Sequence, residues 1–252
     1  MKKLFFEFAL LNLTIWMSSC SIPSTSKPVD EQSNEKTPAL NSRDIIQKSI
    51  AFHDPDSHWN QLKAEFHFSS SFSFNDSIPE ALEISIDVAK NALRYYNLDR
   101  KVDFSFTPDS CWSHQDSSEV SLHSENGPSD CNNYKWTHNF YTYIWGLPMK
   151  LNDPGVIPSN KVLTTVINGI SCYQVEIAYA AETYQFYFAK ENYELIAFEF
   201  LKNDNSAKGE YIKLEGIYEY NSILFPAKRT WMHLQDRSQI GVNQVDSICP
   251  IP

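Results

Sequence analysis

One stretch of the chain alternates apolar and polar residues for long enough to cross a whole domain. In LKAEFHFSSSFSF, residues 62–74, every second side chain is apolar with the exception of Ser70, and all the side chains between them are polar. Because successive side chains of a β-strand point to opposite faces, the pattern predicts a long antiparallel strand with one buried face. That face consists of Leu62, Ala64, Phe66, Phe68, Phe72 and Phe74.

The second half of the chain continues this alternation through hairpins. Asn168-Gly169 separates two alternating runs, and Asn-Gly is the strongest short-range signal for a two-residue hairpin turn. We therefore expect a meander of antiparallel strands there, with shorter strands before it. The predicted strands after the first are 84–88, 102–106, 161–167, 171–179, 184–188, 194–201, 210–220, 223–234 and 239–248.

Two segments have helical rather than alternating periodicity. Apolar residues recur at helical spacing in residues 43–53, with Ser42 or Asn41 available as the N-cap and a proline shortly after the end. In NNYKWTHNFYTYIWGLPMKL, residues 132–151, one helical face holds Trp136, Phe140, Ile144 and Leu147. Gly146 and Pro148 end this helix. The predicted class is α+β: a long curved antiparallel sheet, or half-open β-barrel, of about nine to eleven strands, with an N-terminal helix and a mid-chain helical lid.

The N-terminus reads as an export signal. Lys2 and Lys3 precede an interrupted apolar stretch, residues 4–16, that is too short to span a bilayer. Met17-Ser18-Ser19-Cys20 follows and resembles the lipobox of bacterial lipoproteins. The resemblance implies that residues 1–19 are a signal peptide and that Cys20 is lipidated and anchors the protein to a membrane. An ordinary secretory signal with an incidental cysteine is the alternative.

The remaining chain divides into a tether and one domain. Residues 20–42 are rich in Ser, Pro and Thr and have little to bury, which predicts a flexible tether. Residues 43–252 suit a single domain, since 42% of the whole chain is hydrophobic and 14% is aromatic. The formal net charge of −10, without a basic stripe, argues against nucleic acid as a partner. The oligomeric state is left open by the sequence.

Four cysteines follow Cys20, and an even number in an exported chain predicts two disulfides. Three connectivities are possible. Cys111–Cys131 is favoured because it closes a local polar loop, and Cys172–Cys249 then follows by elimination. A zinc site is the competing interpretation, but no CxxC or HxxxH spacing supports it.

Four segments carry a resemblance to a known family. IAFHDPDSHW, YIWGLPMKLNDPGV, YFAKENYELIAFEF and FPAKRTWMHL resemble an uncharacterised lipoprotein family of Bacteroidota, which is related to the lipoprotein-carrier (LolA/LolB-like) fold. The resemblance implies a half-open barrel whose helices cap a concave apolar cavity that holds acyl chains. It implies no shared catalytic residues. SIPSTSK, directly after Cys20, lacks the acidic cluster that resembles a surface-export signal in this phylum, so we expect a domain on the outer membrane that faces the periplasm.

A ligand cavity is also suggested by the aromatic content. Sixteen Phe, thirteen Tyr and six Trp exceed what the inner face of one flat sheet requires, and a long sheet that curls either fills itself or encloses a ligand. We expect a hydrophobic ligand such as an acyl chain, a lipid or a lipoprotein; a filled core is the alternative. The expected wall is Phe66, Phe68, Phe72, Phe186, Phe198 and Tyr218, with Trp136, Phe140 and Ile144 over the mouth.

Enzyme signatures are absent from the sequence, which lacks GxGxxG, P-loop, GxSxG and HExxH motifs. We therefore expect neither catalysis nor a cofactor. The densest cluster of polar residues is HDPDSHW, residues 53–59. The weak candidates for the metal site of a metal-assisted hydrolase are its residues His53, Asp54, Asp56 and His58. The favoured interpretation is a helix-to-strand turn in which an aspartate caps backbone N–H groups. A further alternative is a structural lipoprotein that joins an envelope complex through exposed aromatics such as Trp136, Trp145 and Trp231.

Overall fold

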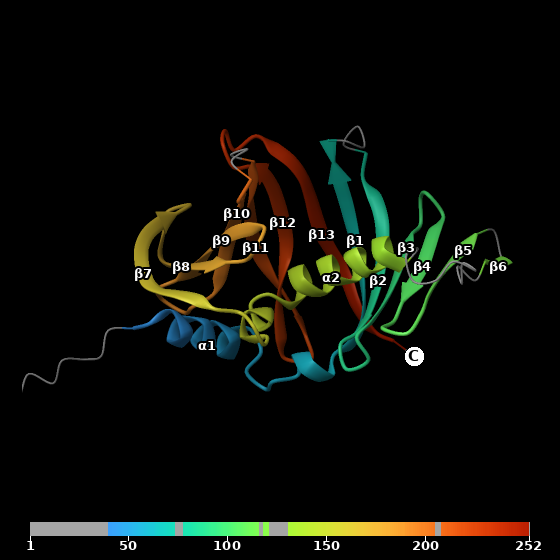
Figure 1. The fold of residues 1–252 in the computed structure, drawn as a ribbon, viewed down its shortest axis with the longest axis horizontal. Coiled ribbons are helices and arrows are strands. Elements are labelled where there is room, and N and C mark those ends of the chain that lie inside the picture. The colour runs from blue at the N-terminus through green and yellow to red at the C-terminus, as the bar shows by residue number, and fades with distance from the viewer. Residues whose placement is uncertain (1–39, 74–77, 116–117, 121–130, 205–207, 252) are drawn as a thin grey trace, which may run out of the picture. The chain divides into compact units, whose positions relative to one another are not determined.

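The computed structural model describes residues 40–73, 78–115, 118–120, 131–204 and 208–251 (Figure 1). The predicted signal peptide, Cys20 and the tether up to residue 39 lie outside these ranges. None of the described helices is long and apolar enough to cross a membrane.

A single antiparallel sheet forms the body of the domain, and it confirms the predicted class of a long curved sheet with two helices. Within the described residues it has thirteen strands, in the order β6-β5-β4-β3-β2-β1-β13-β12-β11-β10-β9-β8-β7. The strands are β1 Lys63–Phe72, β2 Glu80–Asp87, β3 Ala92–Asn97, β4 Val102–Phe106, β5 Cys111–Gln115, β6 Ser118–Val120, β7 Pro158–Ile167, β8 Ile170–Ala178, β9 Glu182–Ala189, β10 Leu195–Lys202, β11 Gly209–Tyr220, β12 Ile223–His233 and β13 Gln239–Pro250.

The strand number exceeds the nine to eleven expected. The additional strands include β3 and β5, whose sequences ALRYYN and CWSHQ do not alternate cleanly, and β6, which has only three residues. The predicted Asn168-Gly169 turn is confirmed between β7 and β8, where Asn168 (φ 51°) and Gly169 (φ 83°) both have positive φ.

The topology consists of two meanders joined in the middle of the sheet. β1 pairs with β13, so the first meander runs outward from β1 to β6 and the second runs inward from β7 to β13. The segment between β6 and β7 must therefore connect opposite edges of the sheet. It contains helix α2 (Asn132–Gly146) and the 3-10 turn η4 (Met149–Asn152), and Figure 1 shows α2 crossing in front of the strands.

Helix α1 (Ser42–His53) begins where its capping chemistry predicts. Asn41 is the N-cap: its side chain accepts a hydrogen bond from the Asp44 backbone N–H, and the Asp44 side chain accepts one from the Asn41 N–H. Ile45 and Ile46 bury the inner side of the helix. The helix contacts β7, β12 and η4, so it covers the end of the sheet away from β6.

The cysteine pairing agrees with the sequence in one case and contradicts it in the other. Cys111 and Cys131 form a disulfide, with Cα atoms 5.8 Å apart. The expected Cys172–Cys249 bond is wrong, because both thiols are free. Cys172 lies on β8 and Cys249 on β13, with four strands between them. At roughly 4.8 Å per strand spacing, the separation along the sheet is about 24 Å, far beyond the roughly 7 Å between Cα atoms that a disulfide allows.

Candidate functional site

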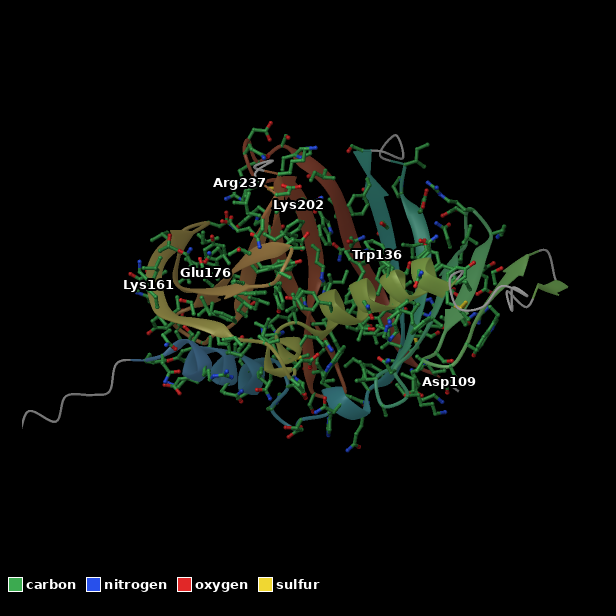
Figure 2. The ribbon with its side chains drawn as sticks, viewed as in Figure 1. Asp109, Trp136, Lys161, Glu176, Lys202 and Arg237 are labelled. Carbon is green, nitrogen blue, oxygen red and sulfur yellow. A yellow bond between two sulfur atoms is a disulfide. The ribbon has the colours of Figure 1, made fainter. Side chains whose placement is uncertain are left out.

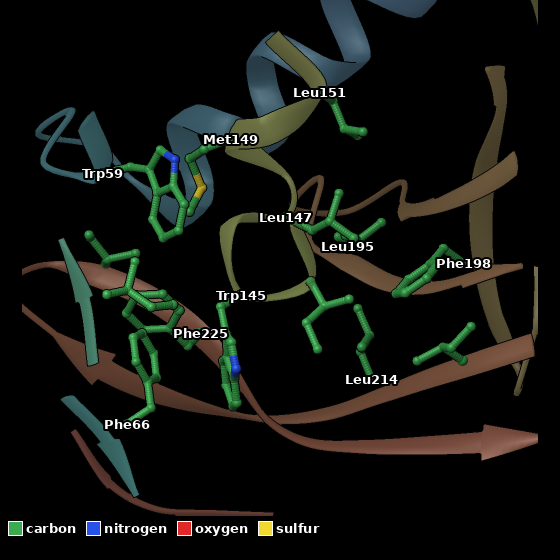
Figure 3. Packing of buried hydrophobic residues seen from close by; sticks show 14 of the residues in the cluster. Trp59, Phe66, Trp145, Leu147, Met149, Leu151, Leu195, Phe198, Leu214 and Phe225 are labelled. Carbon is green, nitrogen blue, oxygen red and sulfur yellow. The ribbon is translucent and has the colours of Figure 1, made fainter. Parts of the chain in front are cut away.

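The concave face of the sheet beneath α2 gathers most of the large apolar side chains. The inward residues of β1, β2 and β8–β13 form one buried cluster with the C-terminal end of α2 and with η4. Figure 3 shows Trp145 in the middle of this cluster, next to Phe66. Trp145 has no exposed surface. The helix is therefore part of the packed interior and not a loose cover over it.

One side of α2 packs on the first meander through aromatic contacts. The Tyr134 ring centroid lies 4.4 Å from that of Phe104 on β4. Closer to the middle of the sheet, the ring centroid of Trp145 lies 4.7 Å from that of Phe66 and 5.3 Å from that of Phe68, both on β1. Spacings of this size are typical of attractive aromatic pairs, each worth about 0.5–1.5 kcal/mol beyond the buried area. These rings fix the helix against β1 and β4.

Other aromatic residues of α2 contact the second meander. The Tyr143 ring lies 6.0 Å from Tyr184 on β9, and its hydroxyl oxygen is 3.5 Å from that of Tyr179. Phe140 lies 5.9 Å from Trp231 on β12. The helix thus contacts both halves of the curved sheet, which it holds together across the concave face.

A buried arginine lies beneath the end of this helix. Arg229, on the inward face of β12, is 1% exposed, and its guanidinium carbon is 3.8 Å from the centroid of the Trp145 ring. Its Nη2 donates to the Ile144 carbonyl oxygen (3.2 Å) and its Nη1 to that of Pro226 (3.4 Å). Burial lowers the Arg229 pKa to about 9, so the side chain stays charged at neutral pH. None of the described carboxylates forms an ion pair with it.

Three buried polar atoms, on Arg229 and on α2, are without a hydrogen-bond partner. They are Arg229 Nε, Trp145 Nε1 and Thr142 Oγ1, of which the last two lie on α2. Asn243, opposite Arg229 in the β12–β13 register, accepts a hydrogen bond from Trp231 Nε1 (2.7 Å) and donates one to Ser70 Oγ (3.0 Å). Unsatisfied buried groups cost about 1–3 kcal/mol each. An apolar face that contains such atoms is not optimised for packing alone.

A cleft opens at the rim of the same sheet, at the shared end of β10, β11 and β12. It has a volume of about 310 Å³. Phe200 connects it to the aromatic interior, since its ring lies 5.4 Å from Tyr184, which stacks on Phe186. Figure 2 labels Lys202 at this end of the sheet. Glu210 also borders the cleft, and burial raises its pKa. The lining residues are Phe200, Lys202, Lys208, Gly209, Glu210, His233 and Gln235.

The residues expected to form a cavity wall do come together on the concave face, but most of them are packed. Phe66, Phe68, Phe186 and Phe198 are buried in the core, as is Ile144 on α2; Phe72, Tyr218 and Phe140 are half-buried. Trp136, labelled in Figure 2, is 65% exposed and stacks on Phe140 at 5.2 Å. Contact of any of these residues with a ligand stays a prediction.

The HDPDSHW segment serves the fold. Both nitrogens of His53 are engaged: Nδ1 donates to the Leu224 carbonyl (2.7 Å), and Nε2 accepts from the Leu195 N–H (3.1 Å). Burial lowers the His53 pKa to about 4, so the ring is neutral at pH 7. The Asp54 carboxylate accepts hydrogen bonds from the backbone N–H groups of His58 and Trp59, four and five positions further along the chain.

This arrangement matches the favoured interpretation of a capped turn. His58 Nδ1 contacts the Asn221 carbonyl oxygen at 2.8 Å, and Asp56 is exposed. The four candidate residues therefore do not direct free ligand atoms at a common point. The geometry does not support a metal site of a hydrolase at this segment.

Two expectations about exposed aromatics are wrong, and Arg229 was missed. Trp145 and Trp231 are buried, at 0% and 5% exposure, because α2 lies on the concave face to which Trp231 points. Arg229 shares a strand face with Phe225 and Trp231, four and two positions away. A charged residue at an inward position of an alternating strand is the sequence signal that could have identified it.

The curved sheet with a helix across its concave face defines the chain as a protein of LolA-like fold. A LolA superfamily protein from Nitrosomonas europaea superposes with a TM-score of 0.53 at 8% identity, covering 85% of this chain and 95% of that one. A domain from Vibrio parahaemolyticus, described as an outer membrane lipoprotein-sorting protein, gives 0.52 at 9% identity over 81% and 91% of the two chains. A DUF1329 family protein from Desulfovibrio piger gives 0.52 at 8% identity over 82% and 92%.

The sequence also assigns the chain to a family. Residues 36–246 match DUF6503, a family of unknown function, and the chain belongs to that family. No curated protein matches the sequence.

Proposed function

We propose that this protein is a lipid-anchored envelope protein that binds a hydrophobic ligand, such as an acyl chain, a lipid or a lipoprotein, on the concave face beneath α2. The observation that carries the proposal is the set of buried polar atoms without partners on Arg229 and on α2, inside an otherwise apolar face. A core built only for stability would satisfy or replace these groups. The fold shared with a lipoprotein-sorting domain supports the same class of ligand.

Binding requires α2 to move, because its rings occupy the concave face. An acyl chain that replaces Trp145 against Phe66 and Phe68 keeps those rings out of water, so the exchange costs far less than exposing them at about 25 cal/mol per Å². The Cys111–Cys131 disulfide holds the start of the helix beside β5. The C-terminal end, which Arg229 holds through the Ile144 carbonyl, is therefore the part proposed to move.

A fluorescent fatty acid tests binding. The full chain in detergent should bind about one probe per chain, and Phe140→Ala should weaken binding roughly fivefold, which corresponds to about 1 kcal/mol of lost apolar contact. Phe52→Ala is the matched control, since Phe52 is also a half-buried phenylalanine on a helix but lies on α1. Absence of saturable binding, or equal weakening by both variants, would contradict the proposal.

Hydrogen exchange tests the movement of α2. In a carrier, amides in the last turns of α2 should exchange through a local opening, at a lower free energy than amides of β1 and β12. Added ligand should change protection in α2 more than in α1. Exchange of α2 only through global unfolding, with or without ligand, would argue for a filled core.

A structural envelope lipoprotein without a ligand is the second candidate. The complete burial of Phe66, Phe68 and Phe186 favours this candidate. So does the exposed Trp136, which stacks on Phe140 and offers an apolar surface to a partner. Stable capture of a partner that Trp136→Ala abolishes, combined with no probe binding, would select this candidate.

Membrane anchoring through Cys20 and a position on the outer membrane facing the periplasm belong to the same proposal. Cys20→Ala should release the protein from the membrane fraction or leave it as the uncleaved precursor. Unchanged partitioning into detergent extracts of the outer membrane would end this part of the proposal.

A further inference from the structure

The convex face of the sheet, opposite the proposed ligand site, contains a cluster of metal-ligating side chains. Glu65 and His67 lie two positions apart on β1, and Glu83 on β2 lies directly opposite His67 in the strand register. Side chains at these positions share one face, and Phe66 and Phe68 occupy the other. Among the described residues, these three form the one group of three or more whose ligand atoms converge, with one atom from each within 4.8 Å of the others.

We propose that Glu65, His67 and Glu83 bind a divalent transition-metal ion of the Zn²⁺ type, with solvent completing its coordination. The site lies on the far side of the sheet from the proposed hydrophobic ligand and does not depend on it.

The two glutamates contact opposite nitrogens of the His67 ring, and one ligand atom from each of the three residues lies within 4.8 Å of the others. His67 Nε2 lies 3.1 Å from Glu65 Oε1, and His67 Nδ1 lies 3.5 Å from Glu83 Oε1. With metal–ligand bonds of about 2.0–2.1 Å in a tetrahedron, neighbouring ligand atoms lie about 3.3 Å apart. Small rotations of the flexible glutamate side chains bring one oxygen of each to this distance from a single imidazole nitrogen.

Neighbouring side chains already orient the cluster. Ser85 Oγ donates to Glu65 Oε2 (2.7 Å), which leaves Oε1 directed at His67. Arg94, whose positive charge acts on both glutamates, is itself paired with Asp103, to which it donates from Nε (3.0 Å) and Nη2 (2.7 Å). The two carboxylates thus share one imidazole between them, an arrangement that a bound cation would stabilise.

The backbone of the cluster is held in place by strand pairing, and its side chains are reached by solvent. β1 is paired on both sides, with β2 and β13, so the positions of the ligating residues are fixed by backbone hydrogen bonds. The three side chains keep 29–31% of their surface exposed, so an ion can reach them from solvent.

The ligand set also selects the kind of ion. One imidazole with two carboxylates suits Zn²⁺, Co²⁺ and related ions, whereas Ca²⁺ and Mg²⁺ prefer ligand sets made of oxygen alone.

Isothermal titration with ZnCl₂ tests the site, using the full chain without an affinity tag, in detergent, after treatment with a chelator. The expected result is one Zn²⁺ per chain, Co²⁺ binding with visible absorption of a low-coordinate complex, and no saturable heat with CaCl₂. His67→Gln and Glu83→Gln should each lower the association constant at least tenfold. Zn²⁺ should also raise the Tm of the wild type and not that of His67→Gln.

Matched controls separate this cluster from incidental ligands. His233→Gln and Glu219→Gln change exposed residues on other strands and should leave the titration unchanged. Cys249→Ser tests the exposed thiol, which lies opposite Glu65 in the β1–β13 register. The proposal is overturned by a wild type that binds no Zn²⁺, by unchanged binding in His67→Gln with retained circular dichroism, or by binding that only Cys249→Ser removes.

Discussion

Replacing Arg229 with methionine should stabilise the resting fold. The guanidinium is fully buried without an ion-pair partner, and burial lowers its pKa from 12.5 to about 9. A shift of this size corresponds to roughly 5 kcal/mol of unfavourable free energy at pH 7, at about 1.4 kcal/mol per pKa unit. The contact with Trp145 returns about 2 kcal/mol and the hydrogen bond to Ile144 about 1 kcal/mol. Methionine, which fills similar space without charge, should therefore raise the free energy of unfolding by about 2 kcal/mol.

The pH dependence gives this prediction a second, independent signature. The folded-state pKa lies below the unfolded one, so the unfolded chain binds more protons between about pH 9 and 12.5, and the penalty shrinks as the pH rises through that window. Between pH 7 and 10 the Arg229 penalty should fall by about 1.4 kcal/mol. Buried tyrosines with raised pKa values, such as Tyr187, act in the opposite direction. The contribution of Arg229 is therefore isolated only by the difference in the free energy of unfolding between the wild type and Arg229→Met.

Urea unfolding followed by tryptophan fluorescence measures this difference at both pH values. We expect Arg229→Met to be more stable at pH 7 and its advantage to narrow by pH 10. Arg229→Lys serves as the comparison. This variant keeps a charge but loses the planar stack on Trp145, so it should be less stable than Arg229→Met. A methionine variant that is less stable than wild type at pH 7, with a gap independent of pH, would refute the account of Arg229 as an uncompensated buried charge.

Other measurements follow from single residues. Phe68→Ser should cost roughly 3–5 kcal/mol if its packed position is the resting state, whereas a much smaller loss in urea unfolding would indicate a lined cavity. His53 has a folded pKa of about 4 against 6.5, so stability should fall as the pH drops from about 6.5 to 4, by roughly 3 kcal/mol; His53→Asn should lose this dependence, and equal slopes would contradict it. Without denaturant, a thiol reagent should label Cys249 quickly and Cys172 only on unfolding, as mass spectrometry can show; fast labelling of Cys172 would conflict with its buried position on β8.

The sheet was predictable because strand alternation is a local signal. The runs around Phe66 and Phe186 place apolar residues at every second position, so the residues of the concave face can be recognised from the sequence pattern alone. The Asn168-Gly169 turn likewise depends only on two adjacent residues that accept positive φ. The pairing of β1 with β13, in contrast, joins the two ends of the domain and has no local signature.

The orientation of α2 could not be predicted from its periodicity. Its sequence, NNYKWTHNFYTYIWG, has aromatic residues on two opposite sides of the helix, so no single apolar stripe identifies the buried face. The choice of Trp136, Phe140 and Ile144 as the inner face was only partly correct, because Trp136 remains exposed and Trp145 is buried instead. The curved surface on which the helix lies decides this rotation, and that surface exists only after both meanders have formed.

The topology bears on how the candidate site is interpreted. Because the connection from β6 to β7 must join opposite edges of one curved sheet, a segment that crosses one face of the sheet is required whether or not a ligand binds there. The presence of α2 is therefore not in itself evidence for a lid. The distinguishing feature is the chemistry beneath its end, where Arg229, Thr142 and Trp145 have polar atoms without partners although apolar side chains could fill the same space. A helix needed only to close the sheet gains nothing from a buried charge, whereas a helix that must leave the sheet benefits from an attachment weaker than an apolar core would provide.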